Sequence, residues 1–425
     1  MAVELSGVSA SPHELEDYAS ALFQSAGYYV EKNITEENVL ELDAVATSYD
    51  TACPEEVLVE AKSGDWGYGD IFKVIGWMKY LGIDRGVFIV KTSGHDPEEV
   101  HTKVASLGVS FIHLGDFSDA TSRFARAGFP LIHDSYRMPL WRYAYWAERN
   151  LISQLKAVTK ADPSKEGPTA VLKHHRFINN TIFFVKDLCE RLSLLYGEYM
   201  KHPRLACGVA LEMGGGSFDP DAHDPDNGLI REALLKGSHP VLQACFYIEH
   251  RARLAILKTA IDYECLMEAG RIPESSATTF DALPHSLRAG IDQLKRDHSF
   301  KRYALFWQVF LWGFGGFYLK DRKDYEFKWL AEQTGIPQEE IPRALKAFDI
   351  LFPLSPTISW LTEIGPSQCI IVKMMPTALR GLGANQRRWR YGFKEFSEFG
   401  YTDFTHRDLI KWNNSLISLL RPEKK

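Results

Sequence analysis

The sequence has few cysteines, and they are scattered. No C-x-x-C pair and no short metal-ligand spacing occurs among them, which argues against a disulfide framework or a structural zinc site and favours a reducing cytoplasm. The start of the chain also lacks a basic stretch followed by an apolar one, so we expect no secretory signal. The six cysteines are Cys53, Cys189, Cys207, Cys245, Cys265 and Cys369.

The chain also lacks a net positive charge. Its formal net charge is -6, but the charge is uneven: residues 1–125 hold 21 acidic and 8 basic residues, and residues 126–425 hold 34 acidic and 41 basic residues. If nucleic acid is the substrate, the C-terminal part must supply most of the attraction for phosphate. The alternative is that the acidic surface merely aids solubility.

A length of 425 residues predicts two or three domains. In the first part, apolar periodicity predicts an α/β domain, in residues 1–120, with a mixed sheet flanked by helices in three layers. The predicted elements are helix 12–26, strands 28–30, 40–46 and 57–62, helix 70–81, strand 85–91, helix 98–107 and strand 109–114.

Residues 121–425 are predicted to be mainly α-helical, because longer helical patterns replace the short strands. Within them, residues 325–350 have the outline of a helix-turn-helix whose second helix would present Arg343 and Lys346 to DNA. Two acidic residues at the start of that helix and Pro342 within it favour a structural helix pair instead. Both readings stay open.

Two further segments of the C-terminal part suggest partners. Residues 380–394 carry five basic residues and no acid among aromatic residues, which suits nucleic acid through Arg387, Arg388 and Arg390, although a solvated basic face is the alternative. Residues 303–319 contain only one polar residue, Gln308, and approach the length of a membrane span. Clustered glycines favour a buried core segment there, with membrane association as the alternative.

Two groups of metal-binding residue types are read as structural. The adjacent His174 and His175 point to different faces of a helix. The aspartates of residues 214–228 lack the register and closing glutamate of a calcium-binding loop. We therefore expect packing or solvent exposure for both groups.

Polar side chains on two predicted strands point to phosphodiester chemistry. Because side chains alternate along a strand, Asp43 lies on one face of its strand, and Glu60 and Lys62 share one face of theirs. Charged residues among Val and Leu are costly to bury unless they pair or bind metal. Hydrolysis at a metal site needs carboxylates for Mg²⁺ and a cation near the attacking water.

The run from residue 15 to residue 91 resembles the PD-(D/E)xK superfamily, and specifically its Mrr-type restriction-endonuclease-like family. The matching motifs are LEDYASALFQSAGYYV with Glu16 in its helix, then Asp43, then EAK at residues 60–62, then RGVFIVKTS. The sequence departs from the family pattern by having no glycine in NVLELDAVA. The resemblance covers about the N-terminal quarter of the chain.

The resemblance implies a role for each matching residue. Asp43, Glu60 and the backbone carbonyl of Ala61 would ligate Mg²⁺ or Mn²⁺. Lys62 would position or deprotonate the attacking water or stabilise the phosphorane, and Glu16 would complete the site from the first helix. Without the resemblance, Glu60 and Lys62 could form a surface ion pair, and Glu16 could be an ordinary exposed helix residue.

Residues after the E-x-K strand are candidates for substrate contact. Trp66 or Tyr68 could stack on a base, and Lys73 lies on the following helix. Packing of these aromatics against the neighbouring helix is the alternative.

The combined pattern predicts a cytoplasmic, Mg²⁺-dependent endonuclease acting on nucleic acid, with DNA favoured and defence against foreign DNA as a setting. A homodimer is expected, because cutting both strands needs two sites. The rival reading is a non-catalytic nucleic-acid-binding or sensor protein on the same scaffold. A membrane-associated regulator acting through residues 303–319 is a third possibility.

Overall fold

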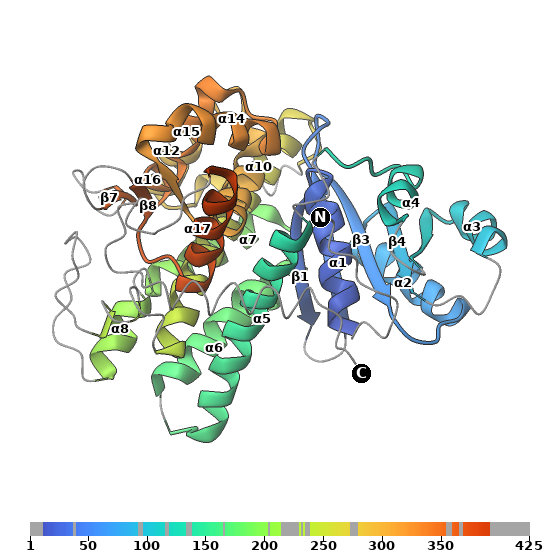
Figure 1. Cartoon of the computed structure of the whole chain (residues 1–425), viewed down its shortest axis with the longest axis horizontal. Coiled ribbons are helices and arrows are strands. Elements are labelled where there is room, and N and C mark those ends of the chain that lie inside the picture. Colours follow the sequence, from blue (N-terminus) through green and yellow to red (C-terminus); the bar gives the residue numbers. More distant parts are fainter. Residues whose placement is uncertain are drawn as a thin grey trace. The chain divides into compact units, whose positions relative to one another are not determined.

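The computed structural model describes residues 12–36, 40–91, 97–114, 119–132, 138–164, 166–202, 205–213, 229–230, 233, 239–272, 279–353, 359–364 and 369–391. These residues form two compact units, which are described separately: one extends to Tyr145 and the other begins at Trp146. Figure 1 labels the helices and strands of both.

The N-terminal unit is built on a five-stranded sheet with strand order β1-β2-β3-β4-β5. Strands β1, β2 and β3 are antiparallel neighbours, and β3, β4 and β5 run parallel to one another. The elements of this unit are α1 (Pro12–Ser25), β1 (Tyr29–Glu36), β2 (Leu40–Ser48), β3 (Glu55–Lys62), α2 (Tyr68–Leu81), β4 (Arg85–Val90), α3 (Pro97–Ala105), β5 (Val109–His113), α4 (Ala120–Arg126) and the start of α5 (Met138–Ala161).

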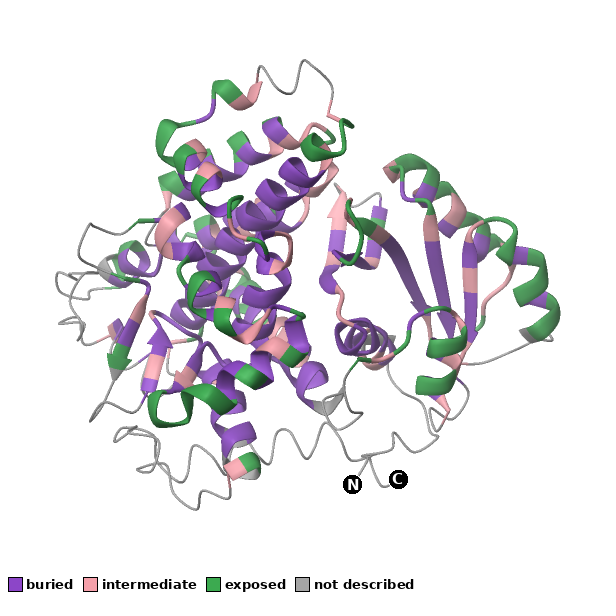
Figure 2. Cartoon of the chain, turned by 90° about the horizontal axis from the view of Figure 1, so that it is seen from above, coloured by how far each residue is buried: buried purple, intermediate pink, exposed green. Residues whose placement is uncertain are grey.

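Helices cover both faces of this sheet. Helix α2 packs on the face of the sheet that carries Gly86. A Cβ atom at Gly86 would clash with the sulfur of Met78, which belongs to α2. Helix α1 packs on the opposite face. Its Asp17 forms an ion pair with Lys32 of β1, and Lys32 shares a face of the sheet with Ala44, its register partner on β2. The strands are therefore buried from both sides, and their central residues are coloured as buried in Figure 2.

This architecture confirms the predicted fold class. The observed order of elements from α1 to β5 is the predicted one, and the mixed sheet with flanking helices fits a restriction-endonuclease-like fold. Strand β1 is longer than the predicted strand at 28–30, because Tyr29–Glu36 pairs with β2 along its length. Helix α4 follows beyond the predicted elements.

The second unit is mostly helical, as predicted. It also contains a small antiparallel sheet with strand order β6-β8-β7, which the sequence pattern did not indicate. Its elements after α5 are α6 (Glu166–Asn179), η2 (Thr181–Phe184), α7 (Leu188–Lys201), α8 (Leu205–Glu212), α10 (Pro240–Glu268), α12 (His285–Leu294), η3 (Phe300–Arg302), α13 (Tyr303–Gln308), η4 (Val309–Gly313), β6 (Phe317–Leu319), η5 (Lys320–Arg322), α14 (Lys323–Thr334), η6 (Gln338–Glu340), α15 (Ile341–Ala344), α16 (Ala347–Leu351), β7 (Leu361–Ile364), β8 (Cys369–Val372) and α17 (Thr377–Tyr391).

Helix α10 is the core of this unit, and its residues from Val241 to Cys265 are buried. Two pairs of charged side chains lie within ion-pair distance along the helix: Lys258 is 2.7 Å from Asp262, and Arg253 is 3.6 Å from Glu249. Such pairing reduces the cost of burying charge, because the desolvation of each group is offset by its partner.

The helical segment between residues 166 and 201 is divided into α6, η2 and α7. Helix α7 has its own N-cap, because the side chain of Asp187 accepts hydrogen bonds from the backbone N–H groups of Cys189 and Glu190. The 3₁₀ helix η2 lies between the two helices, a break that periodicity alone does not reveal.

The apolar run at 303–319 is buried core, as the glycine cluster indicates. It consists of α13, the π-helix η4 and strand β6 rather than one helix. Gly315 and Gly316 have φ values of +75° and +71°, which end the helical stretch. Within the described part of the chain, no helix has the length and apolar character needed to cross a membrane.

The structure does not show the predicted helix-turn-helix at residues 325–350. Helix α14 ends at Thr334, and Gly335 caps it with a φ of +66°, which lets the chain turn. The chain then forms η6, α15 and α16 rather than one recognition helix. Pro342 stands in the first turn of α15, where its missing N–H is tolerated, so the helix begins anew there.

Candidate active site

Asp43 and Glu60 are brought together by the register of β2 and β3. The last paired residues are Ala44 and Val59, so Asp43 and Glu60 occupy the next position, where opposite side chains share a face. The backbone N–H of Ala61 donates a hydrogen bond of 2.7 Å to Oδ2 of Asp43. The strands therefore deliver two carboxylates to one place.

Burial makes this carboxylate pair electrostatically unfavourable. It raises the pKa of Asp43 to about 8, and the nearby charge of Glu60 adds to the effect. It also raises the pKa of Glu60 to about 7, although Lys73 and Lys62 oppose the shift. Such a pair accumulates negative charge in a low-dielectric place, which is where a bound cation is most strongly favoured.

Lys62 lies two residues beyond Glu60 on the same face of β3 and is held by Asp70. Its Nζ is 3.0 Å from Oδ1 of Asp70. Asp70 also accepts a hydrogen bond of 2.9 Å from the backbone N–H of Gly67 at the start of α2. Burial opposes ionisation of Asp70, but these two donors prevail and lower its pKa.

The role of Asp70 is a feature that the sequence pattern did not identify. An acidic residue in the first turn of a helix commonly accepts a hydrogen bond from the backbone at the N-terminus. Asp70 stands at such a position, three residues after Gly67. That spacing is a sequence signal for the cap, but not for the contact with Lys62, which depends on how α2 packs on β3.

Lys73 supplies a second cation beside the carboxylates. Its Nζ lies 3.7 Å from Oε1 of Glu60 and 4.0 Å from the centre of the Trp77 ring. The side chain of Lys73 is half exposed, whereas that of Glu60 is 10% exposed. The ammonium therefore borders the carboxylate from the solvent side.

Glu16 is half-buried on α1, which packs against the other face of the sheet. Its charge contributes to the raised pKa values of both Asp43 and Glu60. Glu16 therefore lies within electrostatic reach of the pair, and its completing the site stays a prediction.

Asp43 and Glu60 fit a divalent cation. Paired carboxylates are preferred ligands of Mg²⁺, and a cation would offset the repulsion that raises their pKa values. Lys62 and Lys73 place positive charge beside the carboxylates. This suits a phosphodiester, because a phosphodiester is anionic. Carboxylates and a nearby ammonium are the groups that metal-assisted hydrolysis uses, so the arrangement supports that chemistry.

The two aromatic candidates lie in packed positions. Trp66 contacts Phe88 and Phe111, with ring centres 5.7 and 5.0 Å away. Tyr68 faces Phe72, with ring centres 6.4 Å apart. Phe88 and Phe111 belong to β4 and β5, so the ring of Trp66 covers the sheet beside the candidate site, whereas the expected packing was against the neighbouring helix. Base stacking stays a prediction for both residues.

The basic candidates of the second unit differ in exposure. Arg343 and Lys346 are exposed, and Arg343 lies 3.7 Å from Asp297. Arg390 is exposed and stacks over the Trp329 ring, 4.1 Å from its centre. The side chain of Arg388 lies outside the described residues.

Arg387, which is expected to contact nucleic acid, lies in the core instead. Its side chain is fully buried, forms an ion pair with Glu326, and donates to the carbonyl oxygens of Phe314, Gly383 and Phe317. A guanidinium committed to these internal acceptors has no surface to offer a phosphate. The basic run therefore mixes structural and exposed arginines, a distinction that only packing reveals.

Comparison with known proteins identifies the N-terminal unit. Residues 8–117 match the Mrr_cat family model, described as restriction endonuclease. No curated protein and no solved structure matches the chain. The match covers the sheet, α1 and the candidate carboxylates, and it confirms the resemblance seen in the sequence. Residues 8–117 are therefore a restriction-endonuclease domain of the Mrr-like, PD-(D/E)xK type.

Proposed function

We propose that this protein is a metal-dependent endonuclease that hydrolyses phosphodiester bonds, with DNA as the substrate. The observation that carries the proposal is the buried pair of Asp43 and Glu60, which lie opposite each other on β2 and β3 beside two lysines. The restriction-endonuclease domain around the pair supports a nuclease in general. The need for a divalent metal, DNA as the substrate and cleavage within the strand are parts of the proposal.

Asp43, Glu60 and the backbone carbonyl of Ala61 would hold Mg²⁺ or Mn²⁺. When bound, the cation supplies charge neutralisation at the phosphate and acidifies a water molecule. Lys62, oriented by Asp70, would hold a proton near the attacking water or donate to a phosphate oxygen. Lys73 would attract the phosphate from the solvent side, and Glu16 would act through its charge on the pair.

The second unit would select the substrate or sense a trigger, using exposed basic side chains for the phosphate backbone. Its composition supports this division, because residues 126–425 carry the excess of basic residues. A homodimer is proposed for cleavage of both strands, since each protomer contains one such domain. Defence against foreign DNA is the proposed setting.

The proposal is tested with purified full-length protein incubated with plasmid, single-stranded DNA and RNA, in Mg²⁺, Mn²⁺ or chelator. We expect plasmid cleavage that chelator abolishes. Glu60→Gln, Asp43→Asn and Lys62→Met should each lower the rate by about 100-fold or more, because transition-state stabilisation of several kcal/mol is lost. Glu55→Gln is the matched control, since it removes an exposed carboxylate from the same strand.

Two results would contradict the proposal. Full activity of folded Glu60→Gln would remove the assignment of the centre. Wild-type protein that binds nucleic acid in Mg²⁺ and Mn²⁺ without breaking strands would favour the non-catalytic reading.

A further inference from the structure

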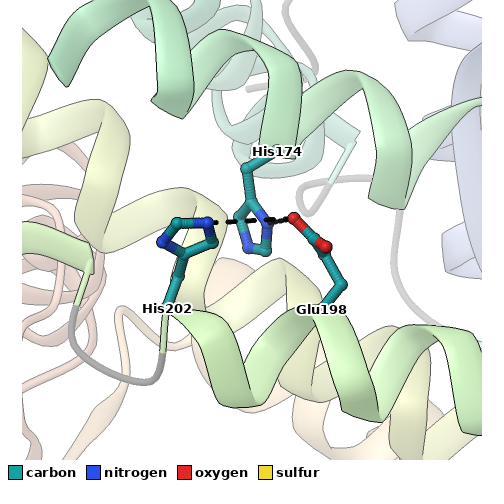
Figure 3. Close-up of side chains that lie close together, drawn as sticks. All are labelled: His174, Glu198 and His202. Carbon is teal, nitrogen blue, oxygen red and sulfur yellow. Dashed lines mark hydrogen bonds and ion pairs between the residues drawn. The ribbon is translucent and has the colours of Figure 1, made fainter. Parts of the chain in front are cut away.

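Two histidines and a glutamate meet between α6 and α7 in the second unit. Glu198 and His202 are four residues apart on α7, so their side chains lie on one face of the helix. His174 extends from α6 toward the same point (Figure 3). Among the described residues, these are the only three or more metal-ligating side chains whose ligand atoms all lie within 4.8 Å of one another.

One oxygen of Glu198 faces both histidines. Its Oε1 is 3.3 Å from Nδ1 of His174 and 3.8 Å from Nε2 of His202. The other oxygen, Oε2, is 3.0 Å from Nζ of Lys201. Lys201 thus fixes the carboxylate through the outer oxygen and leaves the inner one directed at the two rings.

Exposure increases across the group. The side chains of His174, Glu198 and His202 are 2%, 19% and 35% exposed, respectively. Two ligands are thus anchored in the packed helix pair, and the third borders solvent. The group is therefore accessible to solvent from the His202 side.

We propose that His174, Glu198 and His202 form a binding site for Zn²⁺ or a similar first-row divalent cation. Tetrahedral zinc with bonds of about 2.0–2.1 Å places its ligand atoms roughly 3.4 Å apart, close to the separations around Glu198 Oε1. Two imidazoles and one carboxylate are a ligand set of catalytic zinc sites, where water takes the fourth position. Mg²⁺, which favours oxygen ligands, suits the Asp43–Glu60 pair instead.

The protonation states agree with metal binding. Burial lowers the pKa of His174, so the imidazole is neutral near pH 7. Burial opposes ionisation of Glu198, but hydrogen bonds from Lys201 and His174 prevail and lower its pKa. A neutral imidazole and a carboxylate are the forms that coordinate metal, so binding requires little proton release from these two groups.

The test uses full-length, untagged protein freed of metal by chelator, carrying Asp43→Asn and Glu60→Gln to remove the proposed nuclease centre. Co²⁺ replaces Zn²⁺ as a probe, because Co²⁺ in a tetrahedral site with nitrogen ligands absorbs visible light far more strongly than octahedral Co²⁺. We expect saturation at one equivalent, displacement by Zn²⁺, and an affinity for Zn²⁺ that exceeds that for Mg²⁺.

His202→Asn in the same background should weaken Co²⁺ binding by more than about 100-fold. This variant should fold, because the side chain is partly exposed, and circular dichroism checks this. His298→Asn is the matched control, since His298 belongs to the same unit and is 89% exposed; its binding should be unchanged. Glu198→Gln provides the second ligand variant.

Absence of stoichiometric Co²⁺ binding, or equal binding by the His202→Asn protein, would overturn the proposal and leave a metal-free hydrogen-bonded cluster. Because the readout is spectroscopic and the nuclease carboxylates are removed, either result is independent of whether the N-terminal domain cleaves DNA.

Discussion

At the scale of single residues, Asp43 and Glu60 combine burial with like charge. Both effects favour the protonated forms, which is why the pKa values of Asp43 and Glu60 are raised to about 8 and about 7. Lys62 and Lys73 reduce the effect at Glu60 without cancelling it. The domain therefore keeps an unfavourable pair where packed apolar residues would be more stable, which is typical of a functional centre.

This pair predicts that the metal-free protein loses stability as pH rises. The folded carboxyl groups have higher pKa values than their ordinary 3.8 and 4.5, so from about pH 4 to pH 8 the folded state binds more protons than the unfolded state. The free energy of unfolding must then fall with rising pH across this range. Amide hydrogen exchange of residues 40–62, corrected for the intrinsic rate, measures the change.

Asp43→Asn should remove much of this pH dependence and protect β2 and β3 better than wild type at pH 8. Mg²⁺ or Mn²⁺ should stabilise wild type at that pH and have little effect on the variant, because ligand binding to the folded state stabilises it. A wild-type protein whose protection rises between pH 5 and pH 8 would contradict the raised pKa values.

At the scale of elements, one buried ion pair joins α1 to the sheet. The side chains of Asp17 and Lys32 are 5% and 3% exposed, and Lys32 also lies over the Tyr145 ring, 4.6 Å from its centre. The pair stands on the face of the sheet opposite Asp43 and Glu60. Helix α1 is thus held by charge as well as by its apolar residues Leu15, Ala19 and Leu22.

Asp17→Ala should destabilise the N-terminal unit by about 3–5 kcal/mol, because it leaves the Lys32 ammonium buried without this carboxylate. Hydrogen exchange of α1 and β1 measures the loss. The double variant Asp17→Leu, Lys32→Met should recover most of it, since a well-packed apolar pair can replace a buried ion pair. A cost below about 1 kcal/mol for Asp17→Ala, in the range of a surface pair, would show that α1 is held by apolar packing alone.

At the scale of the whole molecule, the two units carry opposite charge balances. The restriction-endonuclease domain lies in the acidic part of the chain, and the exposed Arg343 and Lys346 lie in the basic part. An acidic domain does not by itself attract a polyanion. We therefore expect the second unit to provide most of the affinity for the substrate.

Arg343→Glu with Lys346→Glu should weaken DNA binding and reduce the slope of log affinity against log salt by about 2, since each lost phosphate contact lowers it by about 0.9. Fluorescence anisotropy of a labelled duplex, with the Glu60→Gln protein in chelator to prevent cleavage, gives both quantities. Lys160→Glu, at an exposed position of α5 in the same unit, is the control. Unchanged affinity and slope would exclude this face from substrate binding.

Several features were predictable from sequence because they depend on local periodicity. Alternation along β2 and β3 places Asp43, Glu60 and Lys62, and the spacing of Leu15, Ala19 and Leu22 predicts α1. The apolar run at 303–319 is recognisable as core from its glycines. The break between α6 and α7 and the three short elements after Gly335 were not predicted, because they reflect packing between distant segments.

The amino-acid sequence by itself determined the α/β order of the first domain, its relation to Mrr-type nucleases and the residue types at its centre. Only the tertiary structure decided that Lys62 is held by Asp70, that Arg387 is buried against Glu326, and that His174 meets Glu198 and His202. The reason is physical: strand and helix periods are set by neighbouring residues, whereas each of these contacts joins separate elements whose approach is governed by the packed core.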